Sequence, residues 1–257
     1  PGFGASHSNY AGTIIAGNTF DYPAVHGRAI LDAGYPFCSG SAAAFCADPE
    51  LAGDVWCMDL ICGKQVSVPG FAGESVRYET FSDKLQETLR NYTAGGGNVL
   101  VSGAYIATDI WDSIYPVEKD STFRASSVKF AEDVLGYTYV TGFGSSTGEV
   151  MPVPCRKGLE CPANGSRMAF NNSPGERLYS VEAPDGIVPS SEAGATFLRY
   201  ADTRISAGVC SDFGTYRTVC IGFPVEVLLD DSHIDMIIKS SIEYLKKTEG
   251  HGQEEDI

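Results

Sequence analysis

The sequence predicts an α/β fold: a three-layer sandwich with a mostly parallel central sheet, a β-rich insertion and a late β-hairpin. Two observations predict it. Apolar runs alternate with amphipathic segments over residues 12–141, and residues 95–109, GGGNVLVSGAYIATD, place a short buried strand between two glycine turns. Such sheets bind ligands at the carboxyl ends of their strands. The candidate ligand-binding residues are therefore those that end this strand and follow it: Ser102, Tyr105, Thr108 and Asp109.

The first half of the chain is predicted to alternate strands and helices. We expect strands over residues 12–17, 35–39, 55–61, 99–102 and 137–141, and helices over residues 22–34, 41–45, 83–94 and 122–135. Ser82 is a good N-cap for the third helix, and the glycines from Gly95 onward end it. Gly136 ends the fourth helix in the same way.

The second half is predicted to be rich in β-structure. Short apolar runs between proline and glycine turns indicate a β-rich insertion or edge extension over residues 142–203, and residues 205–222 read as a hairpin. A last helix follows, in which Ser232 and Asp235 resemble a capping box and apolar residues recur at helical spacing. We expect one domain over residues 1–248 and a solvated tail over residues 249–257.

Composition limits the partners. The 257 residues carry 33 acidic and 18 basic side chains, a formal charge of −15, so binding to a nucleic-acid backbone or an anionic membrane is not expected. A neutral or cationic partner fits this charge better. No apolar run approaches the ~20 residues that span a bilayer. Because the first residue is Pro1, we expect the chain to come from a longer protein with flanking domains.

Eight cysteines permit disulfides but do not require them, since reduced cysteines also serve as small buried apolar residues. Cys155 and Cys161 bracket a turn-like segment between two prolines, which makes them one candidate pair. Cys210 and Cys220 lie symmetrically in the predicted hairpin and could face each other across its strands. Both pairings, and the reduced state, remain open.

The order of elements, the segment GGGNVLVSG and the late hairpin that leads into GFPVE resemble the class I glutamine amidotransferase-like fold, which is flavodoxin-like. The resemblance implies a cysteine at a turn after the central strand and a histidine in a His-Pro-Glu run. Here the turn reads SGAYIA and the late run begins at Gly222, so both catalytic residues are missing. Only Glu226 has a counterpart, and it is expected to be structural.

Three runs are similar to segments of secreted or periplasmic Bacteroidetes proteins that carry the label xanthan lyase. They are NTFDYPAVHGRAI, MDLICGKQ and GGGNVLVSGAYIATD. The similarity implies a secreted, periplasmic or cell-surface location and a link to glycans. It does not point to a set of residues that performs a reaction.

Four residues are the candidates for catalysis: Asp21, His26, Asp59 and Tyr105. Asp21 could orient the imidazole of His26, although an isolated histidine is more often structural. Asp59 interrupts an apolar strand, and a buried carboxylate is normally paired or part of a site. The acidic segment DDSHID is explained by the start of a helix, so no metal site and no cofactor are predicted.

The preferred hypothesis is a non-catalytic accessory or binding domain of a secreted or periplasmic multidomain protein linked to carbohydrate processing. The alternative is a polysaccharide lyase or hydrolase that uses the four candidate residues. The two differ in one spatial test: the enzyme requires Asp59, His26 and Tyr105 to converge in an open pocket. A structural spacer between domains is a third possibility, and it would have no pocket of ligand size.

Overall fold

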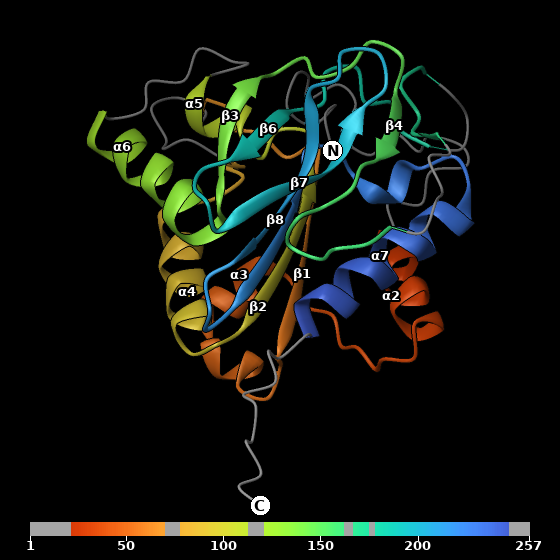
Figure 1. Cartoon of the computed structure of the whole chain (residues 1–257). Helices are drawn as coiled ribbons and strands as arrows, with labels where there is room; N and C mark the ends of the chain where they lie inside the picture. The colour runs from red at the N-terminus through yellow and green to blue at the C-terminus, as the bar shows by residue number, and fades with distance from the viewer. Residues whose placement is uncertain (1–21, 70–77, 113–120, 162–166, 175–177, 247–257) are drawn as a thin grey trace, which may run out of the picture.

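A computed structural model describes residues 22–69, 78–112, 121–161, 167–174 and 178–246 (Figure 1). The strand predicted over residues 12–17 and the candidate Asp21 lie outside these ranges. Among the described residues, no helix is long and apolar enough to cross a membrane.

A seven-stranded mixed sheet forms the centre of the structure, with strand order β1-β2-β9-β8-β7-β4-β5. β1 pairs with β2 and β2 with β9 in parallel, whereas the other four neighbouring pairs are antiparallel. A separate antiparallel pair joins β3 and β6. The strand bounds are β1 Cys57–Gly63, β2 Asn98–Gly103, β3 Tyr137–Thr141, β4 Glu149–Pro152, β5 Met168–Ala169, β6 Gly186–Pro189, β7 Gly194–Tyr200, β8 Ser206–Asp212 and β9 Arg217–Ile221.

The predicted fold class, a three-layer sandwich with a mostly parallel sheet, is therefore wrong. The reason lies in residues 142–203, which were expected to form an insertion or an edge extension. Three of their strands, β4, β5 and β7, continue the central sheet beyond β8. The chain connects these strands without a crossover helix. Parallel neighbours need such a crossover connection, so strands joined without one pair in the antiparallel direction. Only the β1-β2-β9 part has the parallel arrangement that the sequence predicted.

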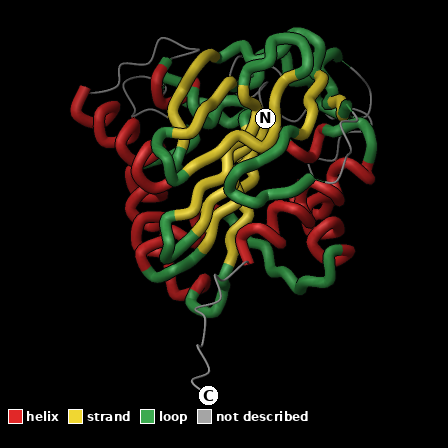
Figure 2. Tube along the Cα trace, in the orientation of Figure 1, coloured by secondary structure: helices red, strands yellow, loops and turns green. Residues whose placement is uncertain are grey.

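Helices cover both faces of the sheet (Figure 2). α2 and α7 lie on one side, and α4 and α6 on the other (Figure 1). The helix bounds are α2 Tyr22–Asp32, α3 Ala42–Ala47, α4 Asp83–Ala94, α5 Thr108–Trp111, α6 Ser121–Phe130 and α7 Asp231–Lys246, with short turns η2 Pro49–Ala52, η4 Ala131–Leu135 and η5 Val225–Val227. The strand expected over residues 35–39 is absent: residues 35–40 connect α2 to α3 without regular structure.

Helix ends follow local chemistry. The Ser82 side chain accepts a hydrogen bond from the Leu85 amide and begins α4, as predicted. Gly136 adopts a left-handed conformation with φ of 86° and ends η4, also as predicted. The start of α7 differs from the prediction, because the Asp230 carboxylate accepts hydrogen bonds from the amide and hydroxyl of Ser232. Asp230, rather than Ser232, caps α7.

The central strands alternate between two apolar clusters. In β2, Leu100 packs in the cluster covered by α2 and α7, whereas Val99 and Val101 pack in the cluster covered by α4 and η4. This alternation is the period of two that a strand buried on both faces requires. In β1 the same parity directs Cys57 to the α2 and α7 side, and therefore also Asp59, two residues further on.

Candidate functional site

A buried ionic cluster joins α2, β1 and η5 on the α2 and α7 side of the sheet. His26 of α2 places its Nδ1 atom 2.7 Å from Asp59 Oδ2 of β1, and its Nε2 atom 3.3 Å from Glu226 Oε2 of η5. The Tyr179 hydroxyl donates a hydrogen bond of 2.8 Å to the other Glu226 oxygen. We call His26, Asp59, Glu226 and Tyr179 the His26 cluster. It brings together two of the four residues predicted for catalysis.

The contacts define the protonation state of the imidazole. Both ring nitrogens lie within hydrogen-bond distance of carboxylate oxygens, an arrangement that a doubly protonated imidazole satisfies on both sides. Burial lowers the pKa of His26, but the charge and hydrogen bond of Asp59, together with those of Glu226, outweigh this effect and raise the pKa to about 10. The side chain is 1% exposed. At neutral pH His26 is therefore a buried imidazolium that has no free nitrogen to accept a proton.

Tyr105, the other described residue predicted for catalysis, does not join the His26 cluster. Tyr105 lies in the turn after β2 and packs beside the α2 and α7 cluster, and the described hydrogen bonds include none between its side chain and His26 or Asp59. The nearby thiols are not activated either. Burial raises the pKa of both Cys57 and Cys62 well above the ordinary thiol value.

The candidate ligand-binding residues after β2 serve the turn instead. Asp109 accepts hydrogen bonds from the amides of Ser67 and Thr80, and so ties the chain after β1 to the segment before α4. The Thr108 hydroxyl and amide both bond to Asp185. Ser102 is fully buried. Thr108 and Asp109 thus bond to protein atoms, whereas Ser102 Oγ is buried with no hydrogen-bond partner among the described residues. A ligand-binding role for Ser102, Tyr105, Thr108 and Asp109 stays a prediction.

Asp185 is a buried residue that the sequence analysis did not single out. Its carboxylate accepts hydrogen bonds from the amides of Ala107 and Thr108 at the start of α5. Burial raises the pKa of Asp185 to about 7, against the hydrogen bonds of Thr108 and Ala107, which lower it. Gly222 allows this arrangement, because a Cβ atom there would lie 2.1 Å from the Asp185 carbonyl oxygen.

The cysteines meet differently from either predicted pairing. No disulfide joins any of the eight in this structure. Cys155 Sγ lies 3.3 Å from Cys210 Sγ. Cys210 pairs with Val219 in the hairpin, and its side chain belongs to the α2 and α7 cluster, whereas Cys220 belongs to the opposite one. Cys210 and Cys220 therefore point to opposite faces of the sheet.

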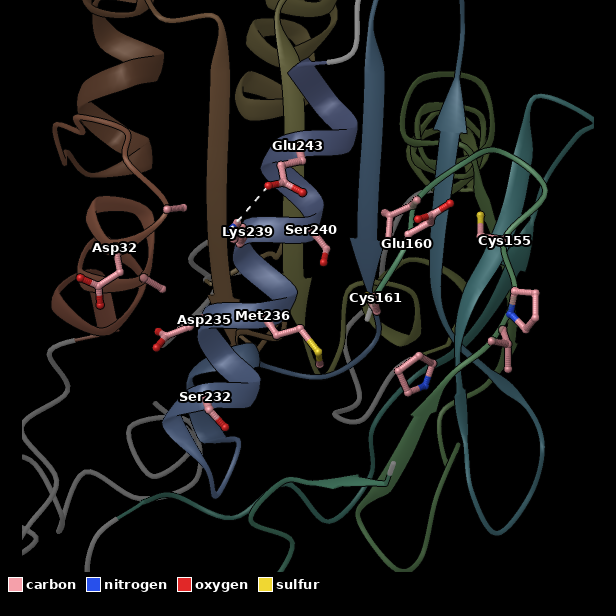
Figure 3. A pocket seen from close by; sticks show the side chains of 16 residues that line it. Asp32, Cys155, Glu160, Cys161, Ser232, Asp235, Met236, Lys239, Ser240 and Glu243 are labelled. Carbon is pink, nitrogen blue, oxygen red and sulfur yellow. Dashed lines mark ion pairs between the residues drawn. The ribbon is translucent and has the colours of Figure 1, made fainter. Parts of the chain in front are cut away.

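A cavity of about 820 Å³ lies between α2, α7 and the loop that follows β4. In Figure 3, α7 runs between Asp32 on one side and Glu160 with Cys155 on the other. Apolar side chains such as Leu159 and Met236 contribute to its lining. The charged lining residues are four acids and one base: Asp32, Glu160, Asp235, Glu243 and Lys239.

Neighbouring cations neutralise part of this acidic lining. Asp235 pairs with Arg28 at 3.3 Å, and Glu243 with Lys239 at 4.0 Å. No salt bridge among the described residues involves Asp32 or Glu160, and both are exposed. The cavity therefore retains negative charge at two of its edges. Within the described ranges, no group of three or more His, Cys, Asp or Glu side chains is arranged to hold a metal ion.

Comparisons with known proteins add no family: no protein-family model matches the chain, and no curated protein matches it.

Sequence reasoning found half of the His26 cluster. Asp59 was marked by its position in an apolar strand, and His26 by its neighbouring carboxylate. Glu226 was expected to be only structural. In the structure its carboxylate contacts the imidazole of His26, a residue 200 positions away in the sequence. Its signal was the lone charge in the run FPVEVLL, the same kind of signal that identified Asp59.

Proposed function

We propose that this chain is a non-catalytic binding domain of a secreted or periplasmic protein that processes carbohydrate, and that its ligand is a neutral or cationic glycan held in the cavity between α2 and α7. The observation that carries the proposal is the contrast between two places. The only imidazole flanked by carboxylates among the described residues is sealed in the core, while the space of ligand size lies between α2, α7 and the loop after β4 and is lined by no residue of the His26 cluster.

The His26 cluster argues against catalysis. A general base needs a free lone pair within reach of substrate, and a nucleophile needs such a base beside it. His26 is doubly protonated and 1% exposed, so it offers neither a lone pair nor access. The alternative, a lyase or hydrolase at Asp21, His26, Asp59 and Tyr105, has the contact between His26 and Asp59 in its favour but lacks an open pocket at that contact.

The cavity fits a ligand rich in hydroxyl groups. Its volume lies in the range of small-molecule sites, about 300–1,000 Å³. Asp32 and Glu160 supply carboxylate oxygens that can accept hydrogen bonds from sugar hydroxyls or an amino group, and Ser232 adds a hydroxyl at the start of α7. The chain carries a formal charge of −15, which disfavours an anionic polysaccharide. A neutral glycan or an amino sugar remains.

The link to carbohydrate and to a location outside the cytoplasm is supported by the sequence resemblance described above. In this proposal the chain holds a glycan while another domain of the parent protein acts on it. The negatively charged edges of the cavity agree with that role, because carboxylates can discriminate between sugars by charge without catalysing a reaction.

A binding screen tests the proposal. The wild-type chain is applied to an array of neutral, amino-sugar and uronate-containing glycans, and hits are titrated by calorimetry. We expect neutral or amino-sugar hits. Asp32→Ala and Glu160→Ala should each weaken the Kd by about tenfold, the loss of roughly one hydrogen bond to a charged group.

Glu87→Ala is the matched control, since Glu87 is an exposed acid on α4, across the sheet from the cavity. It removes the same charge and should leave the Kd unchanged. Cleavage is measured in parallel as new reducing ends and as the absorbance of unsaturated uronate products. Cleavage of any polysaccharide by the wild-type chain would refute the non-catalytic assignment, and hits confined to uronate-rich glycans would refute the ligand class.

A further inference from the structure

Two sulfur atoms from distant parts of the chain meet behind the wall of the cavity. Cys155 lies in the loop after β4 and lines the cavity, whereas Cys210 lies in β8 and is fully buried. Their sulfur atoms are 3.3 Å apart. A disulfide bond is about 2.05 Å long, so the two sulfurs need to approach by little more than 1 Å to form one.

The loop that carries Cys155 is fastened to the sheet on both sides of it. The Val153 amide donates to the Phe197 carbonyl, and the Arg156 guanidinium donates to the Gly194 carbonyl. Both acceptors belong to β7, the strand between β4 and β8. The sulfur of Cys155 is therefore held beside Cys210 by the backbone of the sheet.

The surroundings of Cys155 stabilise a thiolate. The Cys155 and Cys210 sulfurs share a hydrogen bond, and the backbone amides of residues 157–159 donate to the Cys155 sulfur. These contacts outweigh the effect of burial and lower the pKa of Cys155 to about 6. The same interaction, together with burial, raises the pKa of Cys210. The pair thus consists of an accessible thiolate and a buried thiol behind it.

A third cysteine on the same wall does not compete. Cys161 lies at the cavity, and burial raises its pKa to about 11 although a hydrogen bond with Ser240 of α7 lowers it. It stays a neutral thiol at physiological pH, and neutral thiols do not attack disulfides. The exchange chemistry at this wall therefore belongs to Cys155 and Cys210.

We propose that Cys155 and Cys210 form a thiol–disulfide exchange site, in which Cys155 is the attacking residue, Cys210 is the resolving residue and the oxidant is a disulfide compound that enters through the cavity. This assignment does not depend on the glycan-binding role.

The reaction balances in two exchanges. The Cys155 thiolate attacks one sulfur of the oxidant, a new bond forms between the two sulfurs, and the first half of the oxidant leaves as a thiolate. Cys210 then loses its proton to that thiolate and attacks the Cys155 sulfur, which expels the second half of the oxidant. The oxidant gains two electrons and ends as one thiol, which carries the Cys210 proton, and one thiolate, which is protonated by water according to its own pKa; the protein ends with one disulfide.

Oxidised glutathione is the probe for the test. A Cys38→Ser background removes an exposed thiol that would capture glutathione by itself. After oxidation, peptide mapping without reduction should recover the peptide that links Cys155 to Cys210. Of the eight cysteines, seven remain in the Cys38→Ser background, and the number of thiols that react in denaturant should fall by two. A linked peptide that contains Cys155 and Cys161, or Cys210 and Cys220, would overturn the proposal.

Two variants separate the roles of the pair. Cys210→Ala should stop the reaction halfway and leave a stable glutathione adduct on Cys155, whereas Cys155→Ala should leave Cys210 unmodified. A glutathione adduct that persists on Cys155 when Cys210 is present would overturn its assignment as the resolving residue. Circular dichroism confirms that each variant is folded, and because Cys155 is partly exposed, Cys155→Ala keeps the test available if the buried variant fails to fold.

Discussion

Replacing His26 by glutamine should destabilise the protein strongly and in a pH-dependent manner. The substitution removes the only cation of the His26 cluster and leaves Asp59 and Glu226 facing each other's charge, with Glu226 only 1% exposed. Removing one partner of a buried ion pair costs about 3–5 kcal/mol. For a chain of this size each kcal/mol lowers Tm by roughly 2–4 °C, so we expect a decrease of roughly 6–20 °C.

The pH dependence follows from the raised pKa. Free histidine titrates near 6.5 and His26 in the folded chain at about 10, so the folded state holds the proton more tightly. The stability that this proton provides is complete below pH 6.5 and is lost as pH rises through 10. A shift of this size corresponds to on the order of 5 kcal/mol at most. The difference in stability between wild type and His26→Gln should therefore shrink as pH rises.

Urea unfolding of both proteins at pH 6, 8 and 10 measures that difference, and alkaline effects on other groups cancel in the comparison. The double variant His26→Gln with Glu226→Gln is the control, since it removes one of the two carboxylates left without a cation and should recover part of the loss. A difference between wild type and His26→Gln that stays constant from pH 6 to pH 10 would refute the buried imidazolium.

Three further substitutions test the structure around the carboxyl ends of the parallel strands and the start of α7. Asp185→Ala should lower the free energy of unfolding by about 2–4 kcal/mol, because the amides of Ala107 and Thr108 lose their acceptor in the core. Asp185→Asn keeps an acceptor and should lower it less. Equal losses for the two variants in chemical denaturation would contradict this reasoning. Gly222→Ala should prevent or severely impair folding, since its Cβ would lie 2.1 Å from the Asp185 carbonyl oxygen. Normal expression of soluble protein with the wild-type Tm would show that the backbone shifts to make room for the methyl group. Asp230→Ala should cost about 1 kcal/mol by calorimetry as a lost helix cap, and Ser232→Ala less.

The sequence predicted the elements whose signals are local. The cap at Ser82, the glycines after Ala94 and the apolar spacing of α7 each depend on residues within one or two helical turns of one another. The sequence therefore predicted α4 at its true bounds and α7 as the last helix. The strand direction across the sheet was not found. β4 and β7 pair through hydrogen bonds between residues far apart in sequence. The sequence of a short strand close to prolines does not show which neighbouring strand it will pair with.

The same limit applied to the candidate site. A charge in an apolar run indicates that a partner exists but not where it lies. Asp59 and Glu226 each carried this signal, and only the fold shows that one histidine serves both. Asp185 lies in the loop sequence EAPDG, where an aspartate is ordinary turn chemistry, so nothing local distinguished it from an exposed residue.

The parallel pairing of β2 with β9 governs the order in which the chain can fold. β2 lies between β1 and β9, and its Val99 pairs with Thr218 of β9. β2 is therefore paired on both sides only after the hairpin of β8 and β9 has formed. Closing so long a stretch of chain is entropically costly, and contacts of this kind slow folding. During synthesis the inner edge of β2 therefore stays unpaired until the hairpin leaves the ribosome. In that interval the nascent chain exposes an apolar strand edge, the feature on which intermolecular aggregation begins.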